Sequence, residues 1–121
     1  MPAAASPFTI LARRADFLAA ARARRHSRPG LTLQARLRAE GEPVDGVRVG
    51  FTCSKKLGNA VTRNRAKRRL RAAARLAVPR DGRPGWDYLL VGRPGVTVER
   101  PFASLCDDLA SALRAVHGGP A

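Results

Sequence analysis

The sequence predicts an α+β domain, in which a small mixed sheet has helices packed against one face, in the order α-β-β-α-β-α with room for a fourth short strand. Three observations predict this class. Apolar residues recur at helical spacing in three segments, two more segments alternate between apolar and polar residues, and residues 86–92 form a compact apolar run. The chain has 121 residues, 45% of them hydrophobic, which suits one domain over 1–121 with tails at 1–8 and 117–121.

Residues 9–24 are predicted to form the first helix, because their apolar residues, among them Phe17, fall at helical spacing. Thr9 is the expected N-cap, since its hydroxyl can accept a hydrogen bond from the first helical turn. The cations at 22–26 suit the negative end of the helix dipole, so we expect the helix to end there.

Two strands are expected next. Residues 31–38 place leucines and an alanine on one face and polar or basic side chains on the other, which predicts a half-buried strand. Residues 40–46 contain Gly, Glu, Pro and Asp and are predicted to turn. Residues 47–53 then alternate again, so we expect the two strands to pair as a hairpin.

The second helix is predicted over 59–77, with Asn59 as its N-cap and Pro79 just past its end. Residues 86–92 are predicted to form the third strand. The last helix is expected to begin at Pro101, and its apolar stripe favours a packing role. The tripeptide Arg-Pro-Gly occurs three times, at 28–30, 83–85 and 93–95, and each copy predicts a turn.

The charge balance points to a polyanionic partner. The chain carries 23 Lys and Arg against 9 Asp and Glu, a net charge of +14, and nucleic acid is the first candidate. No apolar run is long enough to span a bilayer, and the N-terminal residues do not form a secretory signal. Cys53 and Cys106 form no CxxC pair, so buried thiols in a reducing compartment, and hence a cytoplasmic protein, are expected. His26 and His117 complete no metal-ligand set with them.

The most informative segment is residues 55–75, which hold nine Lys and Arg and no acid among 21 residues. On a helix, Arg63, Lys67, Arg71 and Arg75 follow one another at i+4 and form one ridge. Each such like-charged pair destabilises an isolated helix by roughly 0.2–0.5 kcal/mol, which closely spaced phosphates would relieve. All three lysines of the chain also lie here, which a general bias towards arginine does not explain. The alternative is a solvated basic face, and we favour phosphate binding.

The order of residues in this segment is more specific than its charge. It runs Lys-Lys-Leu-Gly-Asn-Ala-Val-Thr-Arg-Asn-Arg-Ala-Lys-Arg-Arg-Leu-Arg from 55 to 71 and closely resembles the signature of the bacterial ribonuclease P protein subunit. The surroundings agree, because Asp16-Phe17, Gly50-Phe51-Thr52 and Asp87-Tyr88 also match that family. The resemblance therefore covers nearly the whole chain.

The resemblance implies a role and a topology. In that family, the protein joins a large catalytic RNA that removes the 5′ leader from precursor tRNA. The RNA holds the Mg²⁺ and performs the hydrolysis, so we expect no catalytic residue and no metal bound by the protein alone. The expected partners are ribonuclease P RNA and the precursor tRNA leader, with no membrane and no obligate protein partner. The crossover from strand 47–53 through helix 59–77 to strand 86–92 is expected to be left-handed, against the general rule.

Two RNA-binding surfaces are expected from the resemblance. The first faces the catalytic RNA, because guanidinium forks suit phosphates and Asn side chains can bond sugars or base edges. It comprises Lys55, Lys56, Asn59, Arg63, Asn64, Arg65, Lys67, Arg68 and Arg71. The second is a cleft between the first helix and the sheet for the single-stranded leader, where aromatic rings would stack on bases. It comprises Arg13, Phe17, Arg36, Arg48 and Phe51, and the alternative for each Phe is a place in the core.

Four other functions fit the sequence less well. A ribosomal or other structural RNA-binding protein fits the charge but not the ordered motif. A DNA-binding module would show a helix-turn-helix pair or zinc ligands. A membrane-surface protein would need a bulkier apolar face than the alanines of helix 59–77. A protein nuclease would need metal-binding carboxylates.

Overall fold

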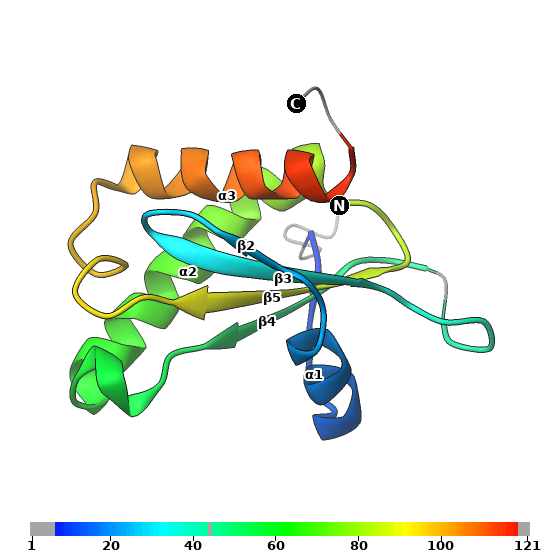
Figure 1. Ribbon diagram of the computed structural model, residues 1–121, viewed down its shortest axis with the longest axis horizontal. Coiled ribbons are helices and arrows are strands. Elements are labelled where there is room, and N and C mark those ends of the chain that lie inside the picture. The colour runs from blue at the N-terminus through cyan, green and yellow to red at the C-terminus, as the bar shows by residue number, and fades with distance from the viewer. Residues whose placement is uncertain (1–6, 44, 119–121) are drawn as a thin grey trace, which may run out of the picture.

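A five-stranded mixed sheet lies at the centre of the computed structural model, which describes residues 7–43 and 45–118 (Figure 1). The strands are β1 (Thr9–Ile10), β2 (Arg25–Ser27), β3 (Leu31–Leu37), β4 (Arg48–Thr52) and β5 (Trp86–Gly92). The helices are α1 (Arg14–Ala21), α2 (Ala60–Asp81) and α3 (Phe102–Val116), and a 3-10 turn, η1 (Lys55–Leu57), precedes α2. The α+β class is therefore confirmed.

The strands are arranged across the sheet in the order β1-β4-β5-β3-β2. β5 pairs in parallel with β4 and antiparallel with β3, so it lies between the two strands that were expected to form a hairpin. The hairpin prediction is wrong because the crossover through α2 returns β5 to the side of β4 that faces β3. The parallel β4-α2-β5 unit itself is present, and its left hand stays a prediction.

Helices cover both faces of the sheet, and not one as predicted. Leu90 and Tyr88 of β5 belong to the main core, which packs under α2 and α3. Leu89, the residue between them, belongs to a second small core with Ala20 and Phe17 of α1. Because neighbouring residues of a strand point to opposite faces, α1 lies on the face opposite α2 and α3, as Figure 1 shows.

The first predicted helix is shorter than expected. Thr9 is not its N-cap but a strand residue, and its N–H donates to the carbonyl of Val47, so β1 extends the sheet beside β4. The helix also ends earlier than predicted, at Ala21, and Arg25 to Ser27 form β2, which pairs antiparallel with β3. Gln34 stabilises the turn between α1 and β2, since its Nε2 donates to the carbonyls of Ala21 and Ala23, 2.8 and 2.9 Å away.

β3 also departs from the predicted alternation of buried and exposed residues. Thr32 and Gln34 were expected to face solvent, but both are buried because α1 covers that face. Leu37 was expected in the core and is 60% exposed, because it lies at the end of the strand beyond the covering helices.

α2 begins as predicted and ends later. Asn59 is the N-cap, and its Oδ1 accepts from the N–H of Thr62 at 2.9 Å. Pro79 lies inside the helix, which continues to Asp81 because Val78 is buried and its carbonyl accepts from Gly82 at 2.8 Å. β5 has its predicted bounds, and Pro101 is the N-cap of α3 instead of its first residue.

The ends of the packed region lie close to the expected tails. Phe8 is buried and contacts the ring of Phe51, and His117 contacts Trp86 and Tyr88, so both residues are packed. Residues 1–6 and 119–121 of those tails lie outside the described residues. No helix within the described residues is both long and apolar enough to cross a bilayer. Cys53 is buried, Cys106 is half-buried, and both are free thiols.

Candidate nucleic-acid interface

Two local caps set the beginning of the basic segment. Ser54 Oγ accepts from the N–H of Lys56 at 3.3 Å and so starts η1. Gly58 then adopts a φ of 132°, a conformation that side-chain-bearing residues rarely take, and lets the chain turn into α2. Lys55 and Lys56 are consequently held next to the helix N-terminus with exposed side chains.

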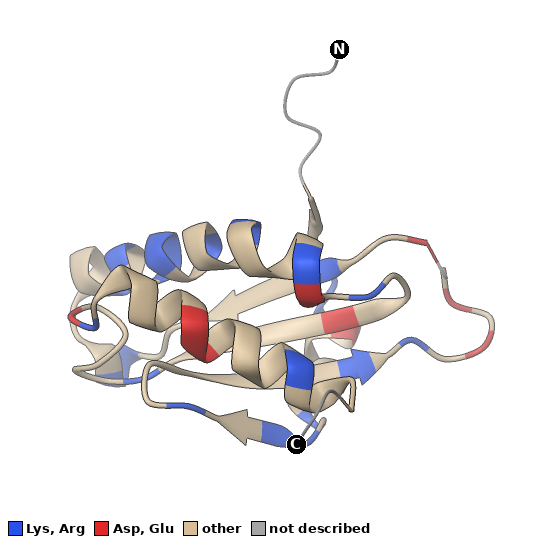
Figure 2. Ribbon diagram, turned by 90° about the horizontal axis from the view of Figure 1, so that it is seen from above, with Lys and Arg blue, Asp and Glu red and all other residues tan. Residues whose placement is uncertain are grey.

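The outward face of α2 continues this positive charge along the helix. Its basic side chains are exposed and take part in no ion pair among the described residues, and Asn64 lies exposed between them. We call this set the α2 surface: Lys55, Lys56, Asn64, Arg65, Lys67, Arg68, Arg71 and Arg75. Figure 2 shows the positive residues repeating along this helix. The structure thus brings together most of the residues predicted to face the catalytic RNA.

Three residues of the basic segment differ from the exposed cations around them. Asn59 uses its Oδ1 as the helix cap, which leaves its amide N–H groups available. Arg63 is half-buried, and its Nε has no acceptor within the described part of the chain. Arg69 turns inward, where it donates to the carbonyls of Thr97 and Arg100. Sequence reasoning gave Arg69 no function, and only its position beside the buried Leu70 signals this inward role.

Ion pairs within the protein involve more than half of its acids but only a minority of its cations. Five of the nine carboxylates pair with five arginines, namely 36, 38, 48, 100 and 114. Of the 23 Lys and Arg, 18 then face only four unpaired acids. The whole excess of +14 is therefore carried by groups outside these ion pairs, and it is available to a polyanion.

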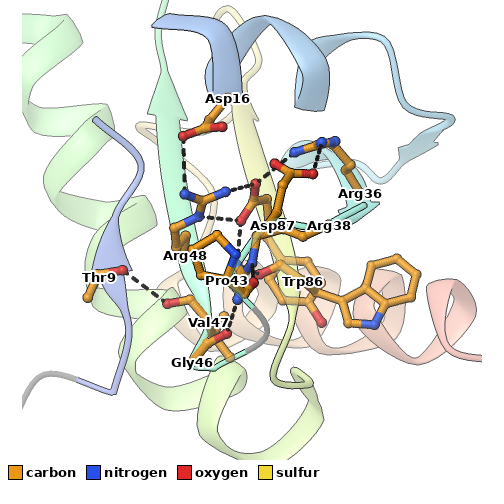
Figure 3. Close-up of polar contacts among 12 residues, drawn as sticks. Thr9, Asp16, Arg36, Arg38, Pro43, Gly46, Val47, Arg48, Trp86 and Asp87 are labelled. Atoms are coloured by element: carbon orange, nitrogen blue, oxygen red, sulfur yellow. Dashed lines mark hydrogen bonds and ion pairs between the residues drawn. The ribbon is translucent and has the colours of Figure 1, made fainter. Parts of the chain in front are cut away.

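Asp87 lies at the centre of the largest of these clusters (Figure 3). Its side chain is fully buried and accepts from Arg48 Nε and Nη2 at 2.7 Å each and from Arg38 Nη1 at 2.6 Å. Arg36 Nη1 lies farther away, at 3.4 Å, and pairs more closely with Glu42. Arg48 also reaches Asp16 of α1 at 3.1 Å. The cluster therefore joins α1 to three strands of the sheet.

The electrostatics of this cluster favour its charged form. Burial alone would raise the pKa of Asp87, but the hydrogen bonds and charges of Arg48 and Arg38 outweigh it and hold that pKa below its usual value. The hydrogen bond to Asp87 in turn raises the pKa of Arg48. Arg38 is itself buried and donates to the carbonyls of Pro43, Trp86, Asp45 and Gly46, so it fixes the end of the turn before β4.

Phe17 lies on the α1 face of the sheet, where the leader cleft was expected. Its ring is half-buried against the small core that includes Leu11 and Leu89. Gly50 of β4 permits this approach, since a Cβ there would lie 3.2 Å from the Phe17 ring. Arg13, just before α1, is exposed on the same side of the molecule as this helix.

Phe51 lies on the opposite face. It follows Gly50 in β4 and packs against the main core, with the Arg71 guanidinium 5.6 Å from the centre of its ring. Four of the five residues predicted to line one leader cleft lie on the α1 side of the sheet, because Arg13 and Phe17 lie with α1 while Arg36 and Arg48 surround Asp87, and Arg48 reaches Asp16 of α1. Phe51 does not join them, since it borders the α2 surface on the opposite face.

Within the described part of the chain, no three His, Cys, Asp or Glu side chains are grouped so that they could hold a metal ion. The acids are instead spread over several arginine partners, as at Asp87 and at Asp108, which pairs with Arg100. The site that the geometry does provide is a cationic surface beside an aromatic ring, which suits RNA.

Comparisons with known proteins agree with this geometry. A model of the family described as Ribonuclease P matches residues 7–117. The chain is 61% identical over 114 residues to the ribonuclease P protein component of Ruegeria pomeroyi, covering 94% of this chain and 90% of that one. It is 51% identical over 106 residues to the component from Caulobacter vibrioides, covering 88% and 69% of the two chains.

Solved structures show the same fold. The RNase P protein from Thermotoga maritima superposes with a TM-score of 0.68 at 25% identity, covering 87% of this chain and 94% of that one. The Staphylococcus aureus RNase P protein gives a TM-score of 0.69 at 21% identity, covering 88% and 94%.

Proposed function

The chain belongs to the ribonuclease P protein family, and from that premise we propose that it is the protein subunit of a ribonucleoprotein that removes the 5′ leader from precursor tRNA. The observation that carries this proposal is the α2 surface, where an exposed run of cations without neighbouring acids lies on the family's ordered motif. Cations so placed repel one another until phosphates lie between them.

The α2 surface is assigned to the ribonuclease P RNA. Its exposed arginines can each take a phosphate in two parallel hydrogen bonds, and the amide groups of Asn59 and Asn64 can bond sugars or base edges. The Arg71–Phe51 contact supports placing Phe51 at the margin of this surface. A guanidinium is attracted to the face of an aromatic ring, so Phe51 and Arg71 lie side by side where the ribonuclease P RNA would bind.

The leader is assigned to the α1 face, on the other side of the sheet. Phe17 offers a half-exposed ring for base stacking, worth ~1–3 kcal/mol per base, and Arg13 an unpaired charge nearby. Arg48 and Arg36 are oriented by Asp87, Asp16 and Glu42, so they would contact the leader with their positions already fixed. Their charges are largely balanced by those acids, so stacking contributes more here than attraction of phosphates.

The chemistry is assigned to the RNA. The carboxylates in ion pairs, Asp87 above all, are committed to arginines, so they do not fit the ligand set that Mg²⁺ prefers. Mg²⁺ bound by the RNA would activate the water that attacks the phosphodiester. The protein's contribution is then to bind both RNAs and to hold the leader beside the catalytic RNA.

The test is reconstitution. We would mix the protein with in vitro transcribed ribonuclease P RNA from Ruegeria pomeroyi at low Mg²⁺ and near-physiological salt, and measure 5′-leader cleavage of a precursor tRNA. Cleavage is expected only when both components are present. Tight binding of that RNA without any gain in cleavage would contradict the proposal and favour a structural RNA-binding protein, such as a ribosomal one.

The α2 assignment is tested separately with Lys67→Ala, Arg68→Ala and Arg71→Ala. Each is expected to lower the slope of log affinity against log salt by about 0.7–0.9, the value for one phosphate contact. Arg80→Ala is the matched control, because Arg80 is equally exposed but lies in the last turn of α2, outside the motif. Equal slopes for all four variants would remove the α2 surface from RNA binding.

A further inference from the structure

A second group of exposed cations lies away from the α2 surface, between the end of α1 and the sheet edge formed by β2. It consists of Arg22, Arg24 and Arg25, whose side chains are all exposed. None of them takes part in an ion pair or side-chain hydrogen bond within the described residues. We call this group the β2-edge surface.

The backbone under these three arginines is held in place. Gln34 Nε2 donates to the carbonyls of Ala21 and Ala23, and Arg25 pairs with Gln34 in the strand ladder. The three charges are therefore presented from a fixed backbone, and their mutual repulsion cannot be relieved by moving the segment away. A partner would meet a backbone that is already ordered, which reduces the entropy lost on binding.

No acid among the residues that the structure describes pairs with this surface. The only acid in residues 7–39 is Asp16, which pairs with Arg48. Arg28, the next cation, turns inward and donates to Ser111 of α3 at 2.8 Å. Burial first, and then the charges of Arg24 and Arg28, lower the pKa of His26, which lies next to Arg25.

The β2-edge surface is separated from the α2 surface by the sheet. β4, which leads into α2, and β2 are three strand spacings apart, or about 14 Å. α1 and α2 also cover opposite faces, as Figure 1 shows, and in Figure 2 positive residues flank α3 on both sides. The β2-edge surface and the α2 surface therefore occupy different parts of the sheet.

Protection of an edge strand does not explain this group. A charged residue on a short edge strand blocks pairing with another chain, and Arg25 alone would serve that purpose on a three-residue strand. Arg22 and Arg24 lie outside the strand. Protection would also allow either sign of charge, whereas all three residues here are positive.

We propose that Arg22, Arg24 and Arg25 form an additional RNA-binding site, besides the α2 surface and the α1 face, which takes the phosphate backbone of an RNA segment separate from the one bound by α2. The inference rests on the proposed function for the presence of RNA partners, and it goes beyond it in naming a site that the motif does not include. The phosphates can belong to the ribonuclease P RNA or to the precursor tRNA, and the experiment separates these sources.

The test uses the triple variant Arg22→Gln, Arg24→Gln and Arg25→Gln in the full chain. In one arm the protein is titrated into the Ruegeria pomeroyi ribonuclease P RNA, and in the other the assembled complex is titrated with precursor tRNA and with mature tRNA. The slope of log affinity against log salt is expected to fall by about two units in one arm, for three phosphate contacts. A fall in the first arm assigns the site to the ribonuclease P RNA, and a fall in the second assigns it to the tRNA.

Two control variants separate contact from general charge. The triple Arg22→Lys, Arg24→Lys and Arg25→Lys keeps the charges and is expected to keep most of the slope. The triple Arg80→Gln, Arg83→Gln and Arg114→Gln removes the same net charge around Asp81 and is expected to leave it unchanged. Thermal unfolding of each variant checks that the fold is intact.

The outcomes distinguish this inference from the proposed function. An unchanged slope in both arms, or an equal fall in the Arg80 control triple, overturns the additional site while wild-type cleavage still stands. Failure of the wild-type protein to bind either RNA overturns the proposed function, and this inference with it.

Discussion

Replacing Asp87 with Asn tests whether the buried arginine cluster holds the fold together. The substitution keeps the shape of the side chain but removes the charge that faces Arg48 at 2.7 Å and Arg38 at 2.6 Å. Arg38 has only 1% of its side chain exposed, so it would remain as a buried cation without a counter-charge. Breaking a buried ion pair in this way costs about 3–5 kcal/mol. Since a typical domain has ~5–15 kcal/mol of stability, the loss is a large part of the total.

The assay is unfolding by urea and by heat, followed by far-UV circular dichroism and by the fluorescence of the single tryptophan, Trp86. At about 4 °C per kcal/mol for a domain near this size, Tm is expected to fall by about 12–20 °C. Glu99→Gln is the control, because Glu99 is exposed and makes the same change in net charge. A loss below about 1 kcal/mol for Asp87→Asn would refute the reasoning and show that the arginines find solvent or other acceptors.

Four further outcomes are expected. The free energy of unfolding of the wild-type protein should decline as pH falls below about 4. The pKa of Asp87 is lower in the folded protein than in the unfolded chain, so the ionised carboxylate stabilises the fold above that pH, and this contribution is lost as the carboxylate is protonated. A pH titration in which the stability of Asp87→Asn declines equally would contradict this. Arg69→Ala should lower the free energy of unfolding by about 1–3 kcal/mol, since it leaves two carbonyls unpaired, whereas Arg68→Ala should leave Tm unchanged and weaken RNA binding. If Arg68→Ala lowered Tm and Arg69→Ala only weakened RNA binding, the two roles would be reversed. Phe17→Ala should weaken binding of precursor tRNA with a leader and spare mature tRNA, and equal losses would place Phe17 in a purely structural role. Burial raises the pKa of Tyr88 to about 12, so absorbance of this single tyrosine should change near that pH, and a midpoint near 10 would show an exposed hydroxyl.

Long helices and strands with a regular apolar pattern could be predicted from the sequence, whereas the pairing of the strands could not. The bounds of β5 and the cap of α2 agree with prediction because local signals determine them. β1 and β2 have two and three residues, which is too short to show a period. Sequence neighbours usually pair, which led to the wrong hairpin. The apolar run Tyr88 to Val91 already indicated a strand buried on both faces, and hence a central one.

The candidate site shows the same division. Exposure of the α2 cations follows from the helical period, so the α2 surface could be assembled from the sequence. The roles of Arg36, Arg38 and Arg48 could not, because their partner Asp87 lies 39–51 residues away and reaches them only through strand order. A basic residue in a basic chain gives no signal that it is paired. Arg36 and Arg48, which are proposed to contact the leader, therefore also belong to a structural cluster that the sequence did not reveal.

The alternation of one strand separates the two proposed RNA partners. Gly50 and Phe51 are neighbours in β4, yet Gly50 faces Phe17 under α1 while Phe51 faces Arg71 of α2. The leader and the catalytic RNA would thus lie on opposite faces of the same strand, within one residue of each other along the chain. Asp87 fixes the beginning of that strand through Arg48, and Asn59 fixes the helix that follows it. Because both faces share this support, the proposed function places its two RNA partners at a fixed separation across one strand.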